Sequence, residues 1–137
     1  MAQAASPSLT TEFGDRLLDP MWRIQNLYSI VTDEGKEIPF RPNAEQMAFV
    51  GSLWTRNLIL KARQLGFTTM AGILGLDQCL FNTNFSAGVI AHNLEDAEKI
   101  FWNKILTPYK RLPEAIRQMV PLEKATASSL RFANGSH

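Results

Sequence analysis

The order of hydrophobic and polar residues in the first third of the chain predicts a helix, a hairpin and a second helix. Apolar residues recur at near-helical spacing from Phe13 onward, and Pro20 is expected to break or restart that helix because proline lacks a backbone N–H. Residues 29–31 and 37–40 flank an Asp-Glu-Gly turn and are expected to pair as short strands. The second helix should begin just after Pro42, at a proline-marked boundary.

Two short apolar runs further along predict buried strands on either side of a long helix. Residues 58–60 are Leu-Ile-Leu, a run too short for a helix, and residues 86–91 contain a second run. Between them, Gly66 precedes a helix that is apolar nearly all round, as a helix covered on several sides would be. A right-handed crossover through this helix would make the two strands parallel. The predicted fold class is therefore α/β, a three-layer sandwich with a mainly parallel sheet, plus the N-terminal helix and β-hairpin.

The remaining elements are predicted from capping and turn residues. Asn93 is expected to cap a helix that Pro108 ends. One more short helix is expected over residues 113–119, followed by paired strands at 122–125 and 130–133.

A polar, basic loop joins the predicted strand at 58–60 to the long helix, which is the layout of a phosphate-binding loop. Gly66 would let the backbone approach an anion, and the Thr68 hydroxyl lies where such loops place a magnesium ligand. The usual pattern G-x-x-x-x-G-K-[ST] nevertheless fails at two positions, because Lys61 replaces its first glycine and Phe67 replaces its lysine. An ordinary strand–loop–helix corner is the competing interpretation.

The segment Lys-Ala-Arg-Gln-Leu-Gly-Phe-Thr-Thr, residues 61–69, resembles the deviant phosphate loop of the large terminase subunits of tailed phages. These ATPases drive DNA into preformed capsids, and in that family the lysine is often displaced to the front of the loop. The resemblance implies an incomplete P-loop NTPase domain that binds ATP and Mg²⁺. It covers the chain from about Phe40 onward.

The resemblance also implies roles for individual residues. Lys61 would neutralise the outer phosphates, and Thr68 would bind magnesium. Arg63 would sense or stabilise the γ-phosphate, although a surface salt bridge is an equal alternative. The residues expected to surround the nucleotide are Gln46, Lys61, Gln64, Leu65, Gly66, Phe67, Thr68 and Thr69.

Gln46 has two competing interpretations. Its place upstream of the loop matches the glutamine that reads the adenine edge in terminases and related helicases, and an amide can both donate and accept there. Asn43 to Gln46 is also close to a capping box, in which the glutamine only returns to the start of its own helix. Both interpretations stay open at this point.

The acidic strand that P-loop ATPases need for hydrolysis is missing from the sequence after the loop. Asp77, the nearest acid behind apolar residues, is expected in mid-helix. We therefore expect residues 1–12 to be a flexible tail and residues 13–137 to be a partial ATPase domain without the acidic motif or the nuclease domain, and without turnover of its own. The alternative is a non-catalytic assembly module with a degenerate phosphate loop.

Composition changes this picture little. The net charge is +1, divided into −4 for residues 1–98 and +5 for residues 99–137, which suggests an anionic partner or simply a solvated basic face. The single cysteine, Cys79, is expected to be a buried thiol. No signal peptide or membrane span is predicted, so the expected location is the host cytoplasm. The partners that the resemblance implies are double-stranded DNA, the small terminase subunit, the portal protein and further copies in a ring.

Overall fold

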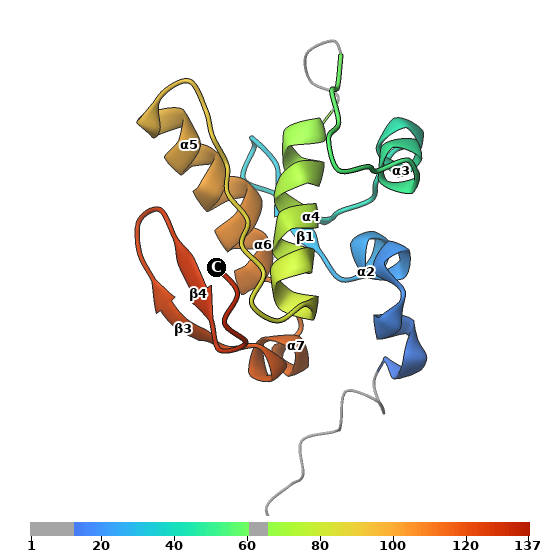
Figure 1. Ribbon diagram of the computed structural model, residues 1–137, viewed down its shortest axis with the longest axis vertical. Helices are drawn as coiled ribbons and strands as arrows, with labels where there is room; N and C mark the ends of the chain where they lie inside the picture. Colours follow the sequence, from blue (N-terminus) through green and yellow to red (C-terminus); the bar gives the residue numbers. More distant parts are fainter. Residues whose placement is uncertain (1–12, 61–65) are drawn as a thin grey trace, which may run out of the picture.

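A computed structural model describes residues 13–60 and 66–137 and consists of helices and two small hairpins (Figure 1). The α-helices are α2 (Pro20–Asn26), α3 (Ala44–Gly51), α4 (Phe67–Phe81), α5 (Leu94–Phe101), α6 (Thr107–Lys110) and α7 (Glu114–Met119). A 3-10 helix η1 (Gly14–Leu18) and a π-helix η2 (Trp102–Leu106) accompany them. The strands are β1 (Ser29–Val31), β2 (Glu37–Pro39), β3 (Leu122–Ala125) and β4 (Leu130–Phe132).

The elements predicted for the N-terminal third are confirmed. The first helix restarts at Pro20, and the Asp19 carboxylate accepts a hydrogen bond from the Met21 N–H, 2.9 Å away, which caps α2. Strands β1 and β2 pair antiparallel with Ile30 opposite Ile38. Gly35 closes their turn with a φ of 78°, a conformation that glycine adopts without strain.

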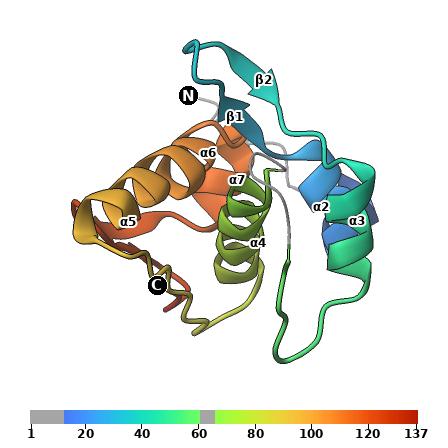
Figure 2. The same cartoon turned by 90° about the horizontal axis from the view of Figure 1, so that it is seen from above.

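Helix α4 lies at the centre of the molecule, with α2 and α3 on one side and α5 on the other (Figure 2). Its buried side chains face both neighbours, as the nearly continuous apolar sequence predicts. The buried apolar residues that α4 supplies to the core are Met70, Ile73, Leu76, Cys79 and Leu80.

The predicted three-layer sandwich with a parallel sheet is wrong. The described residues form only two separate antiparallel hairpins, β1–β2 and β3–β4, and neither predicted run at 58–60 or 86–91 is a strand. Leu58 and Leu60 are 98% and 100% exposed, and Ile90 is 98% exposed.

The reason is that an apolar run becomes a strand only when a neighbouring strand satisfies its backbone groups. Before residues 58–60, the Asn57 side chain instead closes a local turn with the Trp54 backbone. Near residues 86–91, the backbone pairs with the C-terminus, because Ala87 N–H donates to His137 O and His137 N–H donates to Phe85 O.

The helix beginning at Asn93 was expected to end at Pro108, and this expectation is also wrong. The chain remains helical from α5 through η2 into α6. The N–H of Thr107 donates to Trp102 O, five residues back, and the Thr107 hydroxyl also donates to that oxygen at 2.8 Å. This π-turn accommodates Pro108, so the helix continues through it. The short helix α7 and the paired strands β3 and β4 occur where they were predicted.

A buried ion pair joins α2 to α4. The Arg23 guanidinium donates to both carboxylate oxygens of Asp77, at 3.0 and 2.8 Å, and the Tyr28 hydroxyl donates to the same carboxylate at 2.7 Å. The Asp77 side chain is fully buried. Burial of the Tyr28 phenol raises its pKa well above the ordinary value, and the neighbouring Asp77 charge raises it further. All three groups of this contact are therefore paired, as a stable buried charge requires.

Replacing Asp77→Asn should lower the free energy of unfolding by about 3–5 kcal/mol, because it leaves the Arg23 charge buried without its counter-ion. Chemical denaturation would measure this loss. The matched control is Glu37→Gln, which breaks the half-exposed ion pair between Glu37 and Arg111 and should cost under about 1 kcal/mol. Equal losses in the two variants would contradict the structural role of Asp77.

At Gly72, helix α4 lies close against the backbone of η2. A Cβ at Gly72 would lie 2.8 Å from the carbonyl oxygen of Lys104, which belongs to the backbone and cannot move aside. We expect Gly72→Ala to destabilise the protein by about 1–3 kcal/mol in thermal or urea unfolding. Gly75→Ala, whose Cβ would lie 3.7 Å from Ala87, should be neutral or stabilising because alanine favours the helix. A harmless Gly72→Ala would refute this close packing.

Candidate phosphate-binding site

Five of the predicted nucleotide-site residues lie in the described part of the chain, and the structure gathers them around the first turn of α4. These residues are Gln46, Gly66, Phe67, Thr68 and Thr69. The other predicted site residues, Lys61, Arg63, Gln64 and Leu65, fall outside the described residues, as does the tail at residues 1–12.

Gly66 opens α4 in the left-handed conformation, with a φ of 70° and a ψ of 15°. Its carbonyl accepts the first helical hydrogen bond, from the Met70 N–H at 3.0 Å. No side chain among the described residues caps this end of the helix. The N–H groups of the first turn, together with the positive end of the helix dipole, are the features that bind anions at helix N-termini.

The two threonines of the first turn are placed differently. Thr68 is exposed, whereas Thr69 is only 8% exposed. Thr68 is therefore the more accessible of the two hydroxyls, and its binding of magnesium stays a prediction.

Gln46 forms the capping box that was one of its two interpretations. Its side-chain oxygen accepts from the Asn43 N–H at 2.8 Å, and the Asn43 side chain accepts from the Gln46 N–H at 2.8 Å. The same side chain also donates from Nε2 to the carbonyl oxygen of Gly66 at 2.9 Å, and Gln46 is 4% exposed. The capping interpretation is confirmed, and the reading of adenine stays a prediction.

The ring of Phe67, at the position where the usual loop has its lysine, packs against α3. It meets Phe49 edge-to-face, with ring centroids 5.7 Å apart and planes at 73°. The sequence could not indicate this pairing, because Phe49 looks like any other core residue of its helix.

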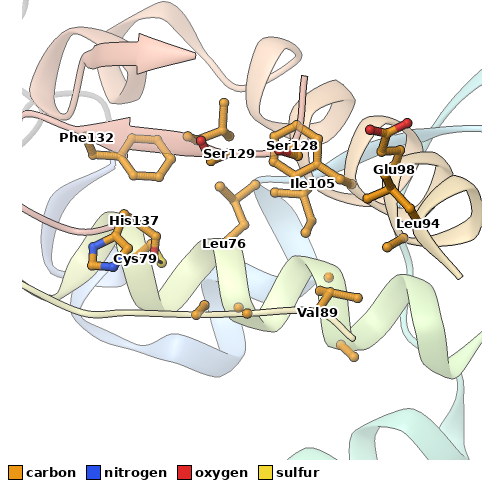
Figure 3. Close-up of a pocket in the computed structure, with 18 residues that line it drawn as sticks. Leu76, Cys79, Val89, Leu94, Glu98, Ile105, Ser128, Ser129, Phe132 and His137 are labelled. Carbon is orange, nitrogen blue, oxygen red and sulfur yellow. Dashed lines mark hydrogen bonds between the residues drawn. The ribbon is translucent and has the colours of Figure 1, made fainter. Parts of the chain in front are cut away.

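A separate cavity of about 450 Å³ lies beside α4, bounded by α5 and the β3–β4 hairpin (Figure 3). Cys79 and His137 lie at one end of it and Glu98 at the other. Burial raises the pKa of the Cys79 thiol, as expected of an unreactive buried cysteine. Apolar walls with a carboxylate at one end do not suit a triphosphate, so this cavity is not the predicted site.

Residues 13–60 and 66–137 contain no group of three or more His, Cys, Asp or Glu side chains placed to hold a metal ion. None of the helices described here is long and apolar enough to cross a bilayer. In comparisons with known proteins, no family model and no curated sequence matched the chain.

Alanine at Gly66 should lower the free energy of unfolding more than alanine at Gly35, a glycine with a similar backbone conformation but open space around it. A Cβ at Gly66 would lie 2.8 Å from Gln46 Nε2, whereas a Cβ at Gly35, with a φ of 78°, would meet nothing within 4 Å. Both alanine variants carry the left-handed penalty of about 1–2 kcal/mol. Only Gly66→Ala also displaces the Gln46 amide, at about a further 1 kcal/mol. Urea unfolding of both variants measures the difference, and equal losses would contradict the contact.

Proposed function

We propose that this chain is the nucleotide-binding front part of a DNA-packaging ATPase of the large-terminase type, in which the start of α4 holds the phosphates of MgATP. The observation that carries the proposal is the left-handed Gly66 at an N-terminus of α4 that no described side chain caps. The resemblance of residues 61–69 to the deviant terminase loop supports the class of protein.

The proposed chemistry follows from the groups at this helix start. The first-turn N–H groups donate to phosphate oxygens. The exposed Thr68 hydroxyl is a ligand for the magnesium ion. Lys61 and Arg63, immediately before this turn in sequence, supply the cations that balance the outer phosphates.

Hydrolysis needs an acidic residue that organises the metal and the attacking water. Asp77 does not fill this role, because its carboxylate is buried and bound to Arg23 and Tyr28. We therefore propose that this chain binds nucleotide without turnover. In a complete packaging motor, hydrolysis would drive translocation of double-stranded DNA through the portal, with the small subunit and further copies as partners.

A second candidate is a non-catalytic assembly module with a degenerate loop. The observation that favours it is the near-complete exposure of the apolar side chains Leu58, Leu60 and Ile90. Large apolar side chains left this exposed can belong to surfaces that another protein covers. This candidate does not require the start of α4 to bind an anion.

Titration of the protein with a fluorescent ATP analogue and Mg²⁺ separates the two candidates. Lys61→Ala should weaken binding about 10- to 100-fold, since it removes a charge-assisted hydrogen bond to the phosphates. Lys99→Ala is the matched control, because Lys99 pairs with Glu95 on the exposed face of α5 and should bind like the wild type. Equal affinity of Lys61→Ala and wild type would contradict the role of Lys61 in holding the phosphates. No binding by either would contradict nucleotide binding and favour the module.

A further inference from the structure

The cavity beside α4 has the size of a small-molecule site. Its volume of about 450 Å³ lies within the range of clefts that enclose small organic ligands. Helix α4, the continuous helix of α5 and η2, residues 87–89 and the β3–β4 hairpin all contribute to its walls (Figure 3). None of residues 66–69 lines it, so the cavity is distinct from the start of α4.

The two ends of this cavity differ in chemistry. Cys79 and Phe132 lie at one end, and both side chains are buried. The His137 ring at the same end already contacts the Ser86 hydroxyl, at 3.2 Å. Glu98 lies at the other end, near Leu94, which is 71% exposed. One end therefore offers apolar contacts, and the end that opens to solvent carries a carboxylate.

Glu98 interrupts an apolar face of α5. Leu94, Glu98 and Phe101 are spaced four and three residues apart, which places them on one side of the helix. All three line the cavity. A charged residue at a position where the pattern calls for an apolar one is a feature that proteins retain mainly at functional sites.

Glu98 also lacks the partner that the other acidic residues of α5 have. The Glu95 carboxylate lies 2.7 Å from Lys99 Nζ, and the Asp96 carboxylate lies 3.0 Å from the ring nitrogen of His92. Within residues 13–60 and 66–137, no cationic side chain forms an ion pair with Glu98. A positively charged ligand in the cavity would find this carboxylate available.

We propose that the cavity binds a small amphiphilic cation, a molecule with an apolar body and one ammonium group. The apolar body packs among Leu76, Val89 and Phe132, and the ammonium group pairs with Glu98 at the open end. Burial of the body supplies most of the affinity, and the charge of Glu98 selects a cation over an anion. This site does not depend on nucleotide binding at the start of α4.

Three molecules of equal chain length test the proposal: octylammonium, 1-octanol and octanoate, which differ in charge. The methyl groups of Leu76, Val89 and Ile105 line the cavity and report its occupancy in ¹H–¹³C spectra. The control is the Val50 methyl signal, because α3 lies on the opposite side of α4 from α5 (Figure 2). Octylammonium should move the three cavity signals but not that of Val50, and it should bind about tenfold more tightly than octanoate.

The role of the carboxylate is tested by Glu98→Gln, which keeps the length of the side chain and removes its charge. Octylammonium should bind this variant about three- to tenfold more weakly, the loss expected when a half-exposed ion pair is removed, whereas the affinity for 1-octanol should not change. The matched control is Glu95→Gln on the same helix, which breaks the exposed pair with Lys99 and should bind all three molecules like the wild type.

The apolar part of the site is tested by Ala97→Leu. Ala97 lines the cavity from α5, and leucine is well accepted in a helix, so the larger side chain should fill the space and weaken all three molecules more than about tenfold.

Each part of the proposal has an outcome that overturns it. If none of the three molecules moves the Leu76, Val89 and Ile105 signals, or if Ala97→Leu binds them all like the wild type, the cavity is not the site. Equal affinities of the wild type for octylammonium and octanoate, or an unchanged affinity of Glu98→Gln for octylammonium, would overturn the selection of a cation.

Discussion

The buried contact among Arg23, Asp77 and Tyr28 is the constraint on which the arrangement of this protein depends. Helix α4 is apolar nearly all round, so hydrophobic burial alone does not select which of its sides faces α2. The Asp77 carboxylate selects that side, because it must contact the Arg23 guanidinium and the Tyr28 phenol. Any other rotation of α4 would bury an unpaired charge. Arg23 adds a bond from its guanidinium to Leu17 O at 2.7 Å, which ties η1 to the same point.

This constraint acts near the far end of α4 from the candidate site. Ten residues separate Phe67 from Asp77, a length of about 15 Å along a helix. The two ends are therefore held by different chemistry: a charged, fully paired cluster at Asp77 and the contacts of α3 at Gly66 and Phe67. An anion at the start of α4 can be bound without disturbing the ion pair that fixes the helix.

The sequence predicted what is encoded locally and missed what depends on distant partners. Pro20 and Asn93 mark helix starts through their own backbone and side-chain chemistry, and both predictions hold. The runs at 58–60 and 86–91 look like strands, but strand formation requires a partner, and the backbone at 85–87 pairs with residue 137. At the site, the glycine that opens the helix followed from the pattern. The Gln46–Gly66 bond, across 20 residues, carried no local signal.

Amide hydrogen exchange of the wild-type protein, measured by NMR with and without saturating MgATP, tests the central claim most directly. The account predicts that nucleotide slows exchange of the Phe67, Thr68 and Thr69 amides, which have no donor role inside the helix. Exchange around Asp77 should stay the same, because the ion pair already holds that turn. Protection gained around the cavity lined by Cys79 and Glu98, with none at residues 67–69, would contradict the assignment of the nucleotide to the start of α4.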